Sequence, residues 1–442
     1  MSANTSFLDK VFITLLLVVF GGIVLHAPLA VGFSTLWPDY SLVIKSWKEI
    51  LLGAALLLAA VILTVRKQWA VVQSKIIAII ILFAALNLLL IPAYFNGFEA
   101  TIAALFINLR YLLFFVLVYV AIRLYPQYYR LFLNVFVTGA LVVIGFAVLQ
   151  LTVLPHDVLK YIGYGESTIM PFLTVDQNMD YVRINSTLRG PNPLGVYAVI
   201  AIAVALAAWL WAPRKLTKFQ LVLVGILGIG GALALWASYS RSAALAGIAA
   251  VGIIVLVAYG RKISKAVWVA LFVAALVVGG SLVVLKDTQF VSQVILHEDP
   301  HEGNDVNSND GHAESLIDGT RRMLQQPLGA GIGSTGSASL LSDKTVIIEN
   351  QYLFIAHETG WVGLVMFLYV NYLVLHGLWQ RRKQWLALAV FASGVGIAIA
   401  GLVLPVWVDD TVSIIWWGLA AVCLALPIMK TAKVGSKKGK QA

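Results

Sequence analysis

The chain has 442 residues, of which 60% are hydrophobic and only 12% carry a charge. A soluble protein of this length could not cover its surface with so few charged residues, so the composition excludes a soluble enzyme and indicates a membrane protein. The formal net charge of +10 does not indicate a nucleic-acid partner, because the basic residues form short clusters beside apolar runs rather than one continuous face.

Apolar runs recur from end to end, and each is close to the roughly 20 residues that a helix needs to cross the hydrocarbon core. The first run ends in a poor cleavage site and is interpreted as a retained span rather than a signal peptide. We therefore predict an all-α polytopic protein with a single membrane domain over residues 1–442. The expected transmembrane helices, about twelve in number, are 11–33, 44–65, 75–92, 100–122, 131–154, 194–212, 219–237, 243–259, 266–285, 360–379, 385–404 and 412–429.

Lysine and arginine are distributed unevenly between the two sides of this bundle. Twelve spans place both termini on one side, and 20 of the 31 Lys and Arg residues fall on that side, whereas Asp9 is its only carboxylate. The positive-inside rule then predicts cytoplasmic termini. The expected location is the cytoplasmic (inner) membrane, with the active site on the outer, periplasmic or extracellular, face.

Two outer connections are long, 155–193 and 286–359, and we expect them to form the active-site face. In the second, residues 297–311 are acidic and turn-rich, 313–326 predict an amphipathic helix lying at the membrane interface, and 329–336 form a glycine-rich turn. The apolar face expected for that helix consists of Leu316, Ile317, Thr320, Met323 and Leu324.

Two motifs in this segment do not indicate cofactors. Gly331, Gly333 and Gly336 have the spacing of a dinucleotide fingerprint, but no strand–helix unit accompanies them. Residues 305–311 resemble a calcium loop whose glycine comes one place late and which lacks the required glutamate. We expect neither a cofactor nor a metal.

Arginine-bearing segments fall on the outer side, where the topology rule disfavours cations. Arginine recognises phosphate oxygens with permanent charge and two-pronged hydrogen bonding, and a helix N-terminus beside it adds to an anion site. The alternative is contact with lipid phosphates or with nearby acids, such as Asp318 for the third segment. The arginines are Arg183 and Arg189 before the sixth span, Arg241 in the Ser238–Ser242 turn, and Arg321 and Arg322 on the interfacial helix.

Glu349 follows three apolar residues, 346–348, just before the tenth span. Apolar surroundings can raise the pKa of a carboxyl into the range useful for a general base, although a glutamate there could simply stabilise a helix N-terminus. His357 and Glu358 are rival candidates. Arg110 lies in mid-span and should face a polar cavity or a charged partner.

Together these segments resemble the O-antigen ligase and O-antigen polymerase superfamily. The matching features are an arginine stretch before Pro191-Asn192, the Ser-x-Ser-Arg turn ending at Arg241, and an outer-helix arginine leading to Pro-Leu followed by alternating glycines at 327–333. Asn350, Gly360 and Gly363 fit the spacing of the ligase signature, but Glu349 occupies the histidine position, which somewhat favours a polymerase.

The resemblance implies a membrane glycosyltransferase of GT-C-like architecture that catalyses metal-independent, inverting transfer. Its donor would be a glycan on undecaprenyl diphosphate, its acceptor a glycan or lipid-glycan, and membrane lipids would surround it. The hypothesis assigns the base role to Glu349 and sugar-binding or orienting roles to Asn350, Asn192 and His357. The diphosphate would be bound by Arg241, Arg189, Arg183, Arg321 and Arg322.

Two other functional classes of membrane protein are also compatible with the sequence. A transporter or flippase of lipid-linked saccharides would place charged or broken-helix residues near the membrane midplane, whereas these motifs gather at one face. A membrane scaffold that binds protein partners would require neither Arg241 nor Glu349.

Overall fold

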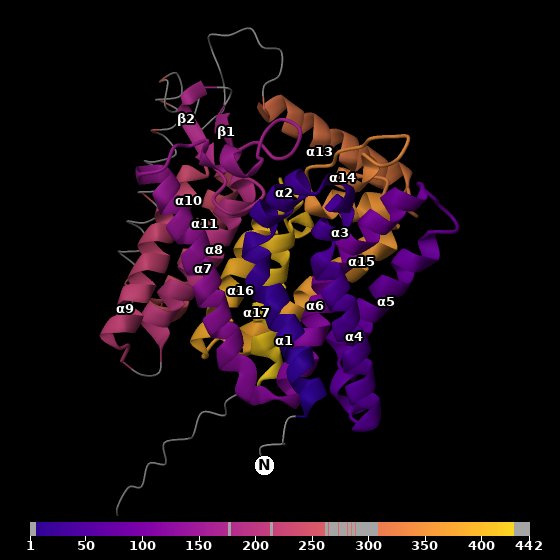
Figure 1. Ribbon diagram of the computed structural model, residues 1–442, viewed down its shortest axis with the longest axis horizontal. Helices are drawn as coiled ribbons and strands as arrows, with labels where there is room; N and C mark the ends of the chain where they lie inside the picture. Colours follow the sequence, from indigo (N-terminus) through magenta and orange to yellow (C-terminus); the bar gives the residue numbers. More distant parts are fainter. Residues whose placement is uncertain are drawn as a thin grey trace, which may run out of the picture.

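The computed structural model describes residues 6–175, 178–212, 215–260 and 308–427, together with the isolated positions 264, 273, 281, 284 and 288. Most of the ninth expected span, 266–285, and most of the acidic segment 297–311 lie outside the described residues. The described chain is mainly helical, as Figure 1 shows.

Eight helical segments among the described residues are long and apolar enough to cross a membrane, and three shorter apolar helices accompany them. These eleven coincide with eleven of the expected spans, so the polytopic architecture is confirmed, while the total of twelve stays a prediction. The long segments contain α1 (Phe7–Gly22) with α2 (His26–Leu36), α4 (Trp47–Val65), α6 (Phe98–Leu124), α7 (Tyr129–Thr152), α8 (Pro191–Trp211), α9 (Lys218–Gly225) with α10 (Gly231–Ala237), α11 (Arg241–Tyr259) and α15 (Gln351–Gln380). The shorter apolar helices are α5 (Lys75–Leu90), α16 (Trp385–Ala400) and α17 (Asp410–Ala425). Three further helices lie outside these segments: α3 (Ser41–Lys45), α13 (Ser308–Gln325) and α14 (Gly336–Ser339).

The centre of the bundle is built from α6, α8, α11, α16 and α17, which pack against one another. Small residues allow the backbones to approach closely, as expected for helices in lipid. A Cβ added to Gly396 of α16 would lie only 2.4 Å from the Ala246 carbonyl oxygen of α11. The large rings of Trp416 and Trp417 fill the adjacent space on α17 and are almost fully buried.

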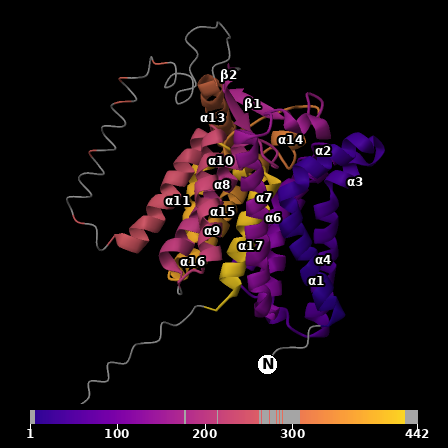
Figure 2. The same cartoon turned by 60° about the vertical axis from the view of Figure 1, so that its left-hand side comes forward.

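The end of the bundle that we predict to face outward carries a small two-stranded β-hairpin, which the all-α expectation did not include. β1 (Phe172–Val175) and β2 (Asn178–Ile184) pair antiparallel, with Phe172 opposite Ile184. Both strands are rich in β-branched and aromatic residues, which favour a pleated surface, but they are too short to stand out in a chain dominated by apolar helices. In Figures 1 and 2 this hairpin, α13 and α14 lie at one end of the bundle and the N-terminus at the other.

Two element boundaries in the second outer segment differ from expectation. α15 begins at Gln351 rather than at 360, because polar residues in its first turns reduce the hydropathy on which the predicted start was based. Gly360 (φ +67°) interrupts the helix. The amphipathic helix α13 begins at Ser308 rather than at 313. It turns Gly319 onto Leu353 and leaves Leu316, Ile317 and Leu324 of the expected apolar face exposed.

Candidate functional site

A cavity of about 320 Å³ lies at the end of the bundle that carries the β-hairpin, between the start of α8 and the loop that leads into α17. Its walls are largely apolar, formed mainly by proline, valine and leucine side chains. Three polar residues line it: Arg189, Asn192 and Asp409. An apolar cavity with a few convergent polar groups is the usual form of a small-molecule site.

Arg183 joins two segments that the sequence singled out separately. Its Nε donates to the Ser238 carbonyl oxygen at 3.0 Å, and its Nη2 donates to Asn192 Oδ1 at 2.7 Å. One guanidinium on β2 therefore fixes the start of α8 against the turn before α11. The structure brings Arg183, Asn192 and the Ser238–Ser242 turn together, as expected for parts of one site.

Arg241 is the first residue of α11 and follows the turn in which Tyr239 has φ +44°. Gly195 of α8 allows this turn to approach, since a Cβ there would lie 2.7 Å from Ser238 Oγ. Ser240 precedes the helix but makes no side-chain capping bond, its Oγ lying 3.2 Å from Ser242 Oγ instead. The N-terminus of α11 thus supplies partial positive charge beside Arg241.

Asp409 is the functional candidate that the sequence reasoning missed. It is the N-cap of α17, where its Oδ1 accepts a hydrogen bond from Val412 N at 2.9 Å. Burial raises the pKa of the Asp409 carboxyl, while the Val412 bond and the charges of Arg189 and Arg110 oppose that rise. The available signal was a pair of carboxylates, Asp409 and Asp410, directly before an apolar run on the outer side.

Glu349 lies outside the cavity lining, between α13 and α15. Its backbone N donates to Ser315 Oγ of α13 at 3.1 Å, and the residue is partly buried. It is nevertheless connected to the cavity wall, because the next two residues bind the loop that ends at Asp409. Asn350 Nδ2 donates to the Leu402 carbonyl oxygen at 2.7 Å, and Gln351 Oε1 accepts from Trp407 N at 2.8 Å.

The side chain of Asn350 makes hydrogen bonds within the protein that stabilise its fold. Its Oδ1 accepts from the N–H groups of Tyr352 and Leu353 at 2.9 and 3.0 Å, which caps α15, and its Nδ2 makes the bond to Leu402. An asparagine in this position stabilises the helix start. The signature residue therefore anchors α15 to the loop of Asp409.

His357 and Glu358 are buried in the first half of α15, away from the cavity lining. Glu358 accepts hydrogen bonds from Asn108 Nδ2 at 2.5 Å and from Gly333 N at 2.9 Å, and the His357 carbonyl oxygen accepts from Ala330 N at 2.6 Å. These bonds hold the glycine-rich turn between α6 and α15.

The two arginines of α13 differ in their surroundings. Arg322 Nε donates to Asp318 Oδ2 at 2.6 Å, which is the intrahelical pairing considered as an alternative to phosphate binding. Arg321 is exposed on the same helix. Neither lines the cavity, so the structure separates them from Arg189 and Asn192.

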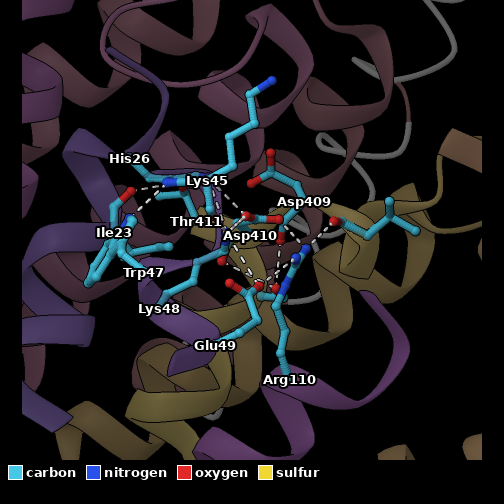
Figure 3. Close-up of polar contacts among 12 residues, drawn as sticks. Ile23, His26, Lys45, Trp47, Lys48, Glu49, Arg110, Asp409, Asp410 and Thr411 are labelled. Atoms are coloured by element: carbon cyan, nitrogen blue, oxygen red, sulfur yellow. Dashed lines mark hydrogen bonds and ion pairs between the residues drawn. The ribbon is translucent and has the colours of Figure 1, made fainter. Parts of the chain in front are cut away.

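Arg110 has charged partners rather than an open cavity. Its guanidinium forms ion pairs with Asp410 and, at 3.6 Å, with Glu49 Oε1, and its Nη2 donates to the Val408 carbonyl oxygen at 2.7 Å. Figure 3 shows these contacts directly beside Asp409. The buried charge in mid-span thus belongs to the wall behind the cavity. Within the described residues, no group of three or more His, Cys, Asp or Glu could hold a metal ion.

Part of the chain matches the model of a known protein family. Residues 227–368 match the family model described as O-antigen ligase, a range that contains the Ser238–Ser242 turn, α13, the glycine-rich turn and Glu349. No curated protein matches the chain. The family match confirms the resemblance to the O-antigen ligase and O-antigen polymerase superfamily and supports a ligase- or polymerase-type role in glycosyl transfer.

Proposed function

We propose that this protein transfers a glycan from an undecaprenyl-diphosphate donor to an acceptor hydroxyl at the outer face of the inner membrane, as a polysaccharide polymerase or ligase. The observation that carries the proposal is the cavity in which Arg189 and Asp409 converge, beside Arg183 and the start of α11. A cation and a carboxylate are the two groups that such a transfer needs. The family match supplies the reaction class.

The cations bind the diphosphate and stabilise the charge that develops as it leaves. Arg189 lines the cavity, and Arg241 lies at a helix N-terminus on the neighbouring turn. Fixed positive charge lowers the barrier most when it lies where negative charge appears in the transition state. Arg183 holds the segments of these two arginines together, while Arg321 and Arg322 would meet only the outer part of the donor.

The chemical step needs one base. The acceptor oxygen attacks the anomeric carbon, the carbon–oxygen bond to the diphosphate breaks, and the electron pair leaves with the diphosphate. The acceptor proton passes to a carboxylate, and attack from the opposite side inverts the anomeric centre. Asp409 lines the cavity and is the first candidate for this base. Glu349 is the rival, because Asn350 and Gln351 connect it to the same loop.

The test is a transfer assay with purified protein in lipid vesicles, a short glycan on undecaprenyl diphosphate, and a chelator in place of added metal. Longer lipid-linked chains would identify a polymerase, and movement of the glycan to a different acceptor would identify a ligase. Folded wild type without product from matching substrates would contradict the proposal.

The same assay distinguishes the two bases. Loss of product in Asp409→Asn with retention in Glu349→Gln assigns the base to Asp409, and the reverse result assigns it to Glu349. Donor binding, measured separately, should persist in both variants because the arginines are unchanged.

A further inference from the structure

A buried group of charges lies behind the wall that carries Asp409. Lys48 Nζ lies 2.8 Å from Asp410 Oδ2 and 3.3 Å from Glu49 Oε1, and Arg110 pairs with the same two carboxylates. His26 Nε2 lies 3.3 Å from Asp410 Oδ2, and Trp47 Nε1 donates to His26 Nδ1 at 3.0 Å. We name these residues of α2, α4, α6 and α17 the Asp410 cluster (Figure 3).

The cluster balances its own charge. Lys48 and Arg110 supply two positive charges, and Glu49 and Asp410 supply two negative ones. Lys48 and Arg110 are only 4% and 6% exposed, so water does little to screen them, and each charge depends on its partners. Removal of one member leaves an uncompensated charge inside the bundle, which is costly.

Asp409 is held on both sides by this cluster. Arg110 Nη2 donates to the carbonyl oxygen of Val408, the residue before Asp409, and also pairs with Asp410, the residue after it. The backbone of Asp409 is thereby fixed while its side chain caps α17 and lines the cavity. The same contacts influence the electrostatic potential at the Asp409 carboxyl, because Asp410 is the next residue in the chain.

We propose that Lys48 and Arg110 are positioning residues that act through Asp410 to hold Asp409 in place and to set its electrostatic surroundings. This inference rests on the proposed role of Asp409 as the base. Among the described residues, the charges that act on Asp409 are those of Arg189 from the segment before α8, Arg110 from α6 and Asp410 from α17. Lys48, Glu49 and His26 reach it only through these residues.

The charge balance of the cluster predicts that removing a cation and removing a carboxylate shift the pKa of Asp409 in opposite directions. Lys48→Met removes a positive charge, leaves Asp410 less compensated and raises the pKa of Asp409. Since the base works when deprotonated, the acidic limb of the pH–rate profile moves to higher pH. Asp410→Asn removes the neighbouring negative charge, leaves Arg110 less compensated and moves the limb to lower pH. A charge within about 4–6 Å shifts the pKa of a carboxyl by about one unit or more, so we expect the larger shift in Asp410→Asn and a smaller, indirect shift in Lys48→Met.

The experiment measures kcat against pH for the full-length protein in vesicles, with saturating undecaprenyl-diphosphate-linked donor. Lys48→Met and Asp410→Asn are compared with Lys48→Arg, which keeps the charge, and with the double variant Lys48→Met/Asp410→Asn, which restores neutrality. The limb should move in opposite directions in the two single variants and return near the wild-type position in the other two. Thermal melting shows which variants are folded.

A folded Lys48→Met variant with an unmoved limb would overturn the inference, as would shifts in the same direction in both single variants. If the single variants do not fold, the test rests on the neutral double variant. An acidic limb of its pH–rate profile displaced by about one pH unit from that of the wild type would overturn the inference. Failure of the underlying function has a different signature, because wild type would then form no product at any pH.

Discussion

Arg189 is the cation that the structure places in the cavity itself, so its contribution should be the largest of the predicted arginines. Loss of one donor that stabilises a developing charge typically costs about 10²- to 10³-fold in kcat. Arg189→Ala should therefore reduce kcat by about 100-fold, and Arg189→Lys by less, because lysine keeps the charge without the paired geometry. The assay is glycan transfer with the lipid-linked donor.

A matched control for Arg189 is Lys160, another outer-side cation, which is exposed and paired with Asp157. Lys160→Ala should leave kcat unchanged. Equal losses in both variants would mean that general outer-side charge, rather than a charge in the cavity, supports transfer.

Asp409 should give transfer a pH dependence of its own. Burial raises the pKa of its carboxyl, so protonation inactivates the base at a pH above the ordinary aspartate value of about 3.9. The rate should fall as the pH is lowered through that raised value. This limb should be absent from the residual activity of Asp409→Asn, and a limb that persists there would assign the titration to another group.

Asp409, in contrast to the arginines, could not be predicted from the sequence. The arginines could be found because cations on the outer side violate the topology rule, and the structure places three predicted residues, Arg183, Arg189 and Asn192, at or beside one cavity. An outer carboxylate violates no such rule. Asp409 can be recognised only in the folded structure, where the loop before α17 packs against the start of α8. These two segments lie far apart in the sequence.

Most helices were predictable because apolar runs define them directly. The start of α15 was not, since Asn350, His357 and Glu358 reduce the apolarity of a segment that the fold nevertheless buries. Hydrogen bonds with Leu402, Asn108 and Gly333 satisfy the side chains of Asn350 and Glu358 there. Tertiary partners of this kind leave no periodic signal in one sequence.

Gly360 makes a prediction about α15. Its φ of +67° is unfavourable for other residues, and an added Cβ would lie 2.5 Å from the Pro327 carbonyl oxygen. Gly360→Ala should therefore destabilise the protein by about 1–3 kcal/mol. Thermal melting of the purified protein measures this, with loss of the outer turn's protection from protease as a second readout.

Gly53 of α4 is the control for this change, because an added Cβ meets nothing within 4 Å and its backbone is helical. Gly53→Ala should be neutral or slightly stabilising. A Gly360→Ala variant that melts with the wild type would show that the break in α15 relaxes without cost.

The whole molecule has a predicted orientation that single cysteines can test. Glu166 lies in the outer segment before the hairpin, and Gln68 lies beside the basic residues Arg66 and Lys67 on the opposite side; both are exposed. An impermeant maleimide should label Glu166→Cys in intact cells and Gln68→Cys only after permeabilisation. The sole native cysteine, Cys423, is buried and gives little background. The reverse labelling pattern would invert the topology.

The charge balance of the Asp410 cluster has a consequence for a protein that works in an energised membrane. A transmembrane potential exerts a force on any net charge in its field, worth about 2.3 kcal/mol for one elementary charge moved through 100 mV. Two cations and two carboxylates, held within a few ångströms of one another, leave no net charge for that field to displace. The membrane potential should therefore exert little net force on the Asp410 cluster itself.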